Sequence, residues 1–340
     1  MKLDFDPRKN ITALDYVIRA TLDYVIGSKS LQNKAHDFLV IRSIVKNWRD
    51  VLLFRLGIKK EKFIVKFKNG LEVKINKPND YFDFWSTSEG QEFLLQARNP
   101  DTKIKVYKKN KLIKFKYGNK IIGFYFDSAR QRSNTIQLIS EEFIIEQYKW
   151  LNLKNKQVID IGANICDSAI YFALKGARHI YAFEPYPYSY ELAQKNIKLN
   201  GLRSKITLLN EGVGGKTSGI RIGSEYKNYG GSDLKNFSSG KSIQITTLED
   251  IVKRFNIENA SLKIDCEGCE YGVILNSPNK ILRKFDQIVI EYHYGYKNLK
   301  AKLENAGFTV RNTQPSFYLN PNSEYPNTIM GFIYATLNES

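Results

Sequence analysis

The feature that most constrains this 340-residue chain is a strand-then-helix rhythm that begins near residue 135. Short apolar runs recur along this part, and helical stretches separate most of them. Strands connected in this way pair in parallel and are covered by helices on both faces. The runs are 157–161, 179–185, 206–213, 261–268 and 287–293.

The last two apolar runs, 307–314 and 327–337, lie too close together for a crossover helix. They are expected to form an antiparallel pair at one edge of the sheet. We therefore predict an α/β fold in which residues 135–340 form a Rossmann-like, mostly parallel sheet with an antiparallel C-terminal edge.

The N-terminal part is predicted to be a separate α+β region. Residues 1–58 form a helical segment, since apolar residues in 11–57 recur near the helical period without a proline. Residues 59–134 are hairpin-rich. Alternation around Asn69-Gly70 in 62–77 predicts a two-residue turn, and alternation of lysine with apolar residues in 103–126 predicts an antiparallel pair with one wet face.

The charge is unevenly distributed, with +13 of the net +17 in residues 1–130. This excess favours acidic partners such as phosphates, nucleic acid, sugar acids or lipid headgroups, although a well-solvated lysine-rich surface is the explanation that we favour. No apolar run reaches the roughly 20 residues that cross a bilayer, and the first ten residues are charged. We predict a cytoplasmic protein without a transmembrane segment; its oligomeric state stays open.

The predicted strands end in polar residues, at the edge where such sheets bind ligands. Gly162 permits a tight turn, and the helix that opens near Asp167 and Ser168 offers free amides. Glu184 follows Asp160 by 24 positions, a spacing that suits a carboxylate gripping ribose hydroxyls. The strand-end residues are Asp160, Glu184, Asn210, Glu211, Asp265, Glu267, Glu291 and His293.

The first turn does not suit a dinucleotide. Residues 160–168 contain one glycine with an acidic residue before it, whereas a pyrophosphate needs a G-x-G-x-x-G turn. This favours a cationic ligand without phosphates. S-adenosylmethionine fits, with its ammonium and sulfonium served by Asp160 and its ribose by Glu184.

Four segments, 158–177, 181–200, 262–275 and 288–308, contain the patterns D-x-G-A-N, E-P-x-P with N-x-x-x-N, and K-I-D-x-E-G-x-E. Over residues 140–335 the chain resembles the FkbM-like methyltransferases, S-adenosylmethionine-dependent enzymes mostly regarded as O-methyltransferases. The resemblance implies a seven-stranded sheet. It places Asp160, Gly162 and Asn164 near the methionine end of the cofactor, Glu184 at the ribose, and Asn210 or Glu211 near the adenine.

The predicted cofactor-binding residues are Asp160, Gly162, Ala163, Asn164, Asp167, Ser168, Glu184, Pro185, Asn210 and Glu211. Cys166 departs from the family, which usually has glycine there. A side chain at this position crowds the cofactor if the residue approaches it. If the residue already begins the helix, cysteine is a small, buryable substitute, and we favour this interpretation.

Methyl transfer to a hydroxyl needs a base, and Asp265, Glu267 and His293 are the catalytic candidates by location. Histidine has the pKa nearest neutrality. Alternatively, Glu267 and Glu270 cap the following helix. Clustered carboxylates can also hold Mg²⁺, which the sequence alone does not support, and we predict no metal site.

The cysteines are Cys166, Cys266 and Cys269, too few for a disulfide framework in a chain of this size, which agrees with a reducing compartment. Cys266 and Cys269 form a C-x-x-C pair, which can bind a metal ion or undergo redox chemistry. Because no second pair exists, we predict small buried residues instead.

Together these features predict an S-adenosylmethionine-dependent methyltransferase of the general EC 2.1.1 class. No N-P-P-Y type tetrapeptide follows the fourth strand, so a hydroxyl on a sugar, glycolipid or small metabolite is favoured over an amino group. Two alternatives stay open. One is an RNA methyltransferase that uses the basic N-terminal region, and the other is a non-catalytic binding module with a degenerate cofactor loop.

Overall fold

The computed structural model describes residues 42, 45–55, 58, 63–68, 72–75, 104–223, 238–319 and 327–338. These residues fall into two compact units, one ending at Ser140 and one beginning at Glu141. Each unit is described by itself. None of the described helices is long and apolar enough to cross a membrane.

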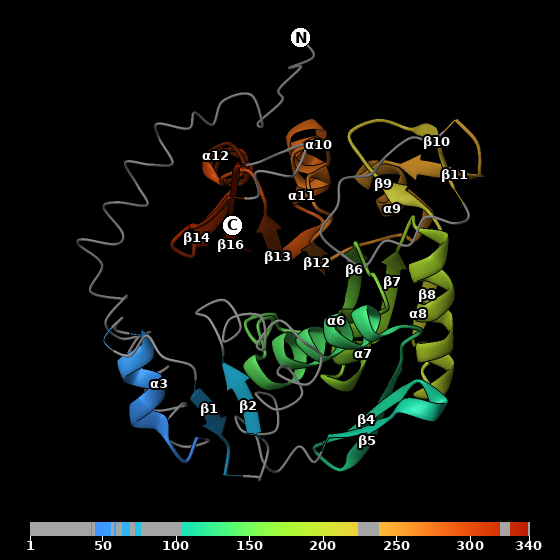
Figure 1. Ribbon diagram of the computed structural model, residues 1–340. Coiled ribbons are helices and arrows are strands. Elements are labelled where there is room, and N and C mark those ends of the chain that lie inside the picture. Colours follow the sequence, from blue (N-terminus) through green and yellow to red (C-terminus); the bar gives the residue numbers. More distant parts are fainter. Residues whose placement is uncertain are drawn as a thin grey trace. The chain divides into compact units, whose positions relative to one another are not determined.

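The unit from Glu141 onward is built on one sheet with the strand order β14-β16-β13-β12-β6-β7-β8 (Figure 1). Neighbouring strands from β13 to β8 pair in parallel, as predicted. The strands are β6 Gln157–Ile161, β7 His179–Phe183, β8 Ile206–Leu209, β12 Ala260–Ile264, β13 Phe285–Tyr292, β14 Phe308–Asn312 and β16 Asn327–Leu337.

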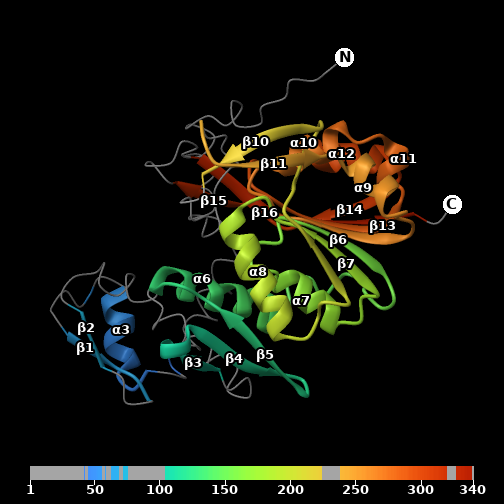
Figure 2. The same ribbon diagram turned by 90° about the vertical axis from the view of Figure 1, so that its right-hand side faces the viewer.

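Helices cover both faces of this sheet (Figure 2). On one face lie α7 Asp167–Leu174 and α8 Pro187–Leu199; on the other lie α9 Leu248–Arg254, α10 Cys269–Asn276, α11 Asn279–Leu282 and α12 Lys297–Asn305. Local sequence fixes two of the helix starts. Pro187 occupies the first turn of α8, and Thr247 forms a capping box with Asp250 at α9.

The core lies along the central strands. All five residues of β12 are buried, as are four of the five in β6. Apolar side chains such as Ile159, Ile161, Leu262 and Ile264 are 0–1% exposed and pack in one cluster with the helices. Burial on both faces accounts for the nearly continuous apolar runs seen in the sequence.

The antiparallel C-terminal edge is confirmed, with one addition. β16 inserts between β13 and β14 and pairs antiparallel with both, and a further strand, β15 Ser316–Leu319, pairs with its beginning. The run predicted as one strand over 206–213 is instead two. β8 ends at Leu209, and β9 Gly212–Val213 joins a separate sheet with β10 Ser218–Ile222 and β11 Lys241–Thr246.

In the unit that ends at Ser140, β1 Phe63–Lys66 and β2 Glu72–Ile75 form the predicted antiparallel hairpin. The predicted two-residue turn at Asn69-Gly70 lies outside the described residues, and the described register pairs Val65 with Val73. The predicted second pair is a three-stranded sheet of β3 Lys105–Tyr107, β4 Leu112–Tyr117 and β5 Lys120–Tyr125.

The described part of this first unit contains the α-helices α3 Trp48–Arg55 and α6 Ala129–Ile139 and a short 3-10 helix, Lys108–Asn110. A π-helical turn, Ser140–Ile145, leads into the second unit. Most of the helical segment predicted for residues 1–58 lies outside the described residues.

Candidate functional site

A pocket of about 660 Å³, partly open to solvent, lies at the carboxyl ends of the parallel strands. The loop after β6 contributes Gly162 and Asn164, and the end of β7 contributes Glu184 and Pro185. β9 and the loop after β12 complete the lining, the latter with Asp265, Cys266, Glu267 and Cys269. The pocket therefore lies at the edge where sheets of this kind bind ligands.

Gly162 brings two of these loops into direct contact. Its φ is +77°, and a Cβ atom built on it would lie 1.7 Å from the carbonyl oxygen of Asp265. The backbone N–H of Asp265 in turn donates to the carbonyl of Ile161 at 3.0 Å. Only glycine fits this position, because any other side chain would meet the backbone of the second loop.

Glu184 is held at the tip of β7 with its side chain turned back onto the first loop. One carboxylate oxygen accepts the backbone N–H of Asn164 at 2.8 Å, and the other accepts that of Tyr186 at 2.8 Å. The residue is 4% exposed, and this burial raises the pKa of its carboxyl to about 8 despite the two hydrogen bonds. Glu184 therefore lines the pocket in a fixed orientation.

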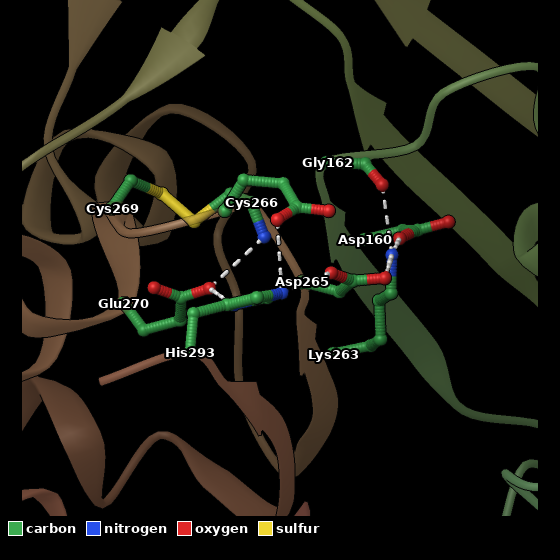
Figure 3. The surroundings of a disulfide bond; sticks show 9 residues. Asp160, Gly162, Lys263, Asp265, Cys266, Cys269, Glu270 and His293 are labelled. Carbon is green, nitrogen blue, oxygen red and sulfur yellow. Dashed lines mark hydrogen bonds and ion pairs between the residues drawn. A yellow bond between two sulfur atoms is a disulfide. The ribbon is translucent and has the colours of Figure 1, made fainter. Parts of the chain in front are cut away.

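Asp160 does not line the pocket; it forms a buried ion pair within the sheet (Figure 3). The register places Lys263 of β12 directly beside it, and their charged groups lie 3.1 Å apart. The Lys263 ammonium also donates to the carbonyl oxygen of Gly162 at 2.8 Å. Although burial opposes the charge, Asp160 and neighbouring carboxylates raise the pKa of Lys263 above its ordinary value.

Sequence reasoning missed Lys263 as a site residue. The available signal was a single lysine inside the apolar run 261–264, at a position that proves to be 2% exposed. A buried ammonium requires a carboxylate partner. Pairing that lysine with Asp160 and with the glycine turn required the strand register, which the sequence does not display.

The start of α7 is buried rather than open to the pocket. Ser168 donates its hydroxyl to the Asp160 carboxylate at 2.7 Å, and Ala163 is fully buried. Asp167 is 4% exposed, and burial raises its pKa to about 7 although Lys263 opposes this. Burial and the nearby Asp167 also raise the pKa of Glu142.

The two residues predicted near the adenine contact protein groups instead of lining the pocket. Asn210 donates to the backbone carbonyls of Glu184 and Pro185 at 2.9 and 3.0 Å, so it braces the end of β7. Glu211 forms a two-pronged ion pair with Arg254 at 2.6 and 2.8 Å.

Cys166 occupies the position immediately before α7 in a left-handed conformation, with φ 63° and ψ 31°. Glycine adopts this conformation without strain, whereas other residues enter it at a cost of about 1–2 kcal/mol. The thiol is fully buried, burial raises its pKa, and the residue is not part of the pocket lining.

The three predicted catalytic residues lie together at the ends of β12 and β13. His293 is 2% exposed, with Nδ1 2.8 Å from Glu270 and Nε2 3.1 Å from Glu267 and 4.0 Å from Asp265. Burial lowers the pKa of His293, but Glu270, Glu267 and Asp265 together raise it well above its ordinary value. Asp265, Glu267 and His293 each offer one ligand atom within 4.8 Å of the others, so this group can hold a metal ion.

Cys266 and Cys269 form a disulfide, which corrects their prediction as small buried residues (Figure 3). Both are partly exposed and line the pocket. The loop between them doubles back before α10, with Glu267 at φ 58° and Gly268 at φ 123°, and this brings the two Cα atoms to 5.5 Å. A separation in this range permits a disulfide.

The mostly parallel sheet carries a glycine turn after β6 and a carboxylate, Glu184, directly after β7. Residues 160–310 match the model of the methyltransferase FkbM domain. This segment is an FkbM-type methyltransferase domain. It contains every predicted catalytic and cofactor-binding residue, and the resemblance to the FkbM-like methyltransferases is confirmed.

Solved structures that match part of this chain include methyltransferases at low identity. A candidate SAM-dependent methyltransferase from Streptococcus mutans is 10% identical, with 66% of this chain and 56% of that one covered and a TM-score of 0.35. TrmK of M. capricolum bound to S-adenosyl-homocysteine is 19% identical (58% and 69% covered, TM-score 0.35).

A candidate RNA methyltransferase from Pyrococcus horikoshii is 10% identical, with 63% of this chain and 87% of that one covered and a TM-score of 0.32. The chain spans little more than half of the Streptococcus mutans protein. Among curated proteins, none matches this sequence.

Proposed function

We propose that the FkbM-type domain transfers a methyl group from S-adenosylmethionine to a hydroxyl on a sugar, a glycolipid or a small metabolite. The observation that carries the proposal is the pocket itself. Its wall combines a glycine turn without room for a side chain and a fixed carboxylate, Glu184, at the tip of the next strand. A ribose is recognised by a carboxylate in this place.

In this proposal Asp160 serves the cofactor indirectly. Its carboxylate holds Lys263, and the ammonium of Lys263 holds the carbonyl of Gly162. The shape of the glycine turn therefore depends on the buried pair. Acidic groups that face the pocket, among them Asp265, supply the negative potential that suits a sulfonium and an ammonium.

Calorimetry with S-adenosylmethionine and S-adenosyl-homocysteine tests the cofactor. At pH 9, above the pKa of Glu184, we expect both to bind the full chain and Glu184→Gln to weaken binding by about 10- to 100-fold. The reason is that a hydrogen bond to a charged group is worth about 1.5–3 kcal/mol. Glu304→Gln, on the exposed side of α12, is the matched control and should leave affinity unchanged. Failure of the wild-type chain to take up either molecule would refute the proposal.

The acceptor proton is proposed to leave through Asp265 or Glu267. Both line the pocket, whereas His293 contacts carboxylates through each ring nitrogen and is not part of the lining. His293 then positions Glu267. With an acceptor found by transfer of a radiolabelled methyl group to sugars, glycolipids and RNA, Asp265→Asn or Glu267→Gln should lower kcat about 100-fold or more. Binding of S-adenosyl-homocysteine should change less than the rate.

A divalent cation such as Mg²⁺ is a second way to lower the pKa of an acceptor hydroxyl. Asp265, Glu267 and His293 are the described residues that would hold it. Activity that is lost with a chelator and restored by Mg²⁺ or Mn²⁺ would favour the cation. Activity that survives chelation would favour a protein base.

One observation favours the alternative acceptor, RNA. The three-stranded sheet of the first unit and its turns expose six lysines, which are Lys105, Lys108, Lys109, Lys111, Lys116 and Lys120. Such a surface suits a phosphate backbone. Methyl transfer to RNA in the acceptor panel, with none to sugars or glycolipids, would decide for this alternative.

A further inference from the structure

The disulfide between Cys266 and Cys269 has no part in the proposed methyl transfer, yet it lies in the wall of the same pocket. Both cysteines are partly exposed, so a small thiol can reach them. The stretch they enclose contains Glu267, one of the two proposed bases. The bond therefore joins two lining residues across a loop that the reaction would use.

The bond is poorly suited to a purely structural role. The loop-closure effect of a disulfide grows with the number of residues it encloses, and this one links residues only three positions apart. It lies at the surface of a pocket and joins the end of β12 to the start of α10. Its direct consequence is local, in the conformation of the loop 266–269.

That loop is held in an unfavourable backbone conformation. Glu267 has φ 58°, a left-handed value that non-glycine residues rarely adopt, and Gly268 follows at φ 123°. The conformation places the Glu267 carboxylate 3.1 Å from His293 and lets the Cys266 N–H donate to Glu270 at 3.2 Å. Without the bond, the loop is free to relax away from these contacts.

The position of Cys269 favours exchange with other thiols. It is the first residue of α10 and lines the pocket, so an external thiol can reach its sulfur. The helix amide groups favour a thiolate there, whereas the nearby carboxylates of Glu267 and Glu270 oppose it. Cys166 provides the contrast within the same chain. It is fully buried, and burial raises the pKa of its thiol, so it should remain unreactive.

We propose that Cys266 and Cys269 form a reversible redox site, and that the disulfide form binds the cofactor more tightly than the dithiol form. A thiolate of an external dithiol attacks one sulfur to give a mixed disulfide, and its second thiolate then releases the protein dithiol. The protein gains two electrons and two protons while the reagent becomes a disulfide. The ligand part of this inference rests on the proposed function.

Equilibration of the full chain in dithiothreitol buffers of graded redox potential, followed by alkylation and mass spectrometry, tests the redox site. We expect the disulfide between Cys266 and Cys269 to be reduced and re-formed reversibly as the potential changes. Cys166 should stay unmodified in the folded chain. A pair that never forms the bond, or that opens only on unfolding, would overturn the inference.

Calorimetry with S-adenosyl-homocysteine on the oxidised and reduced chain tests the coupling. We expect binding to be about 3- to 10-fold weaker after reduction, since the lining loop is then less preorganised. By reciprocity, saturating S-adenosyl-homocysteine should lower the midpoint potential, by about 30 mV for a tenfold difference in affinity. Equal affinities and an unshifted midpoint would overturn the coupling.

The double variant Cys266→Ser, Cys269→Ser should bind like the reduced chain at every redox potential, and the control Cys166→Ser should keep the redox dependence. If neither redox form binds S-adenosyl-homocysteine, the proposed function and the coupling both fail. The alkylation titration decides the redox site independently of that result.

Discussion

At the scale of single residues, Glu184 combines deep burial with a place in the pocket wall, and this predicts a pH dependence. Burial raises its pKa from an ordinary 4.5 to about 8. The unfolded chain releases this proton near pH 4.5, whereas the folded chain keeps it up to about pH 8. Between these values folding takes up a proton, so this carboxyl makes stability fall as pH rises, by up to about 1.4 kcal/mol per pH unit.

Glu184→Gln should remove this pH dependence of the free energy of unfolding. Urea midpoints of the wild type and the variant at pH 5.5, 6.5 and 7.5 measure it, and the difference between the two proteins isolates Glu184 from other buried carboxyls such as Asp167. The control Glu304→Gln should follow the wild type. Parallel curves for Glu184→Gln and wild type would mean that this carboxyl is ionised throughout the range.

The second prediction at the scale of single residues concerns Cys166. Replacing it with glycine relieves a left-handed backbone but removes a buried sulfur, so the free energy of unfolding should change by less than about 1 kcal/mol. Because Cys166 is not part of the pocket lining, affinity for S-adenosyl-homocysteine should change by less than about twofold. Calorimetry and urea unfolding measure the two effects.

A tenfold gain in affinity on Cys166→Gly would show instead that the thiol crowds the cofactor. That result would favour the non-catalytic binding module with a degenerate loop.

At the scale of elements, strand β12 depends on a charge at its centre. Lys263→Met should destabilise the chain by about 3–5 kcal/mol, because Asp160 is left buried without a counter-charge. Urea unfolding at pH 7.5 measures this.

A matched control is Lys253→Met on α9, where the lysine side chain is 67% exposed beside Glu249. The free energy of unfolding should change there by less than about 0.5 kcal/mol. If Lys263→Met does not fold, adding Asp160→Asn should restore folding. No recovery in the double variant would contradict the central role of this pair.

Strands β6 and β12 show which structural features the sequence predicts and which it does not. β6 coincides with the predicted 157–161 because its short apolar run follows Lys156 and ends at the turn residue Gly162. The partner of Lys263 depends on the register between β6 and β12, and the disulfide depends on positive φ angles at Glu267 and Gly268. Neither is encoded in periodicity. β9 was missed for a similar reason, since the break between β8 and β9 follows from pairing with β11.

At the scale of the whole molecule, the net charge of +17 predicts retention by polyanions. We expect the chain to bind heparin, with retention that weakens steeply as salt rises. Changing Lys108, Lys109 and Lys111 to Gln should shift elution to lower salt, because these lysines are exposed in the first unit. Changing Lys154, Lys195 and Lys198, which are exposed in the methyltransferase unit, supplies a charge-matched comparison.

Equal shifts for both triple variants would mean that retention reports total charge and no particular surface. A larger shift for the first variant would support a phosphate-binding surface in residues 104–120.

The close approach of Gly162 to the backbone of Asp265 couples the two sides of the pocket. One of these peptide segments is proposed to hold the methyl donor, and the other carries groups proposed to face the methyl acceptor. Since no side chain separates them to absorb a displacement, we expect departure of the spent donor and release of the methylated product to be linked motions. The rate of turnover would then be set by how easily both segments shift together.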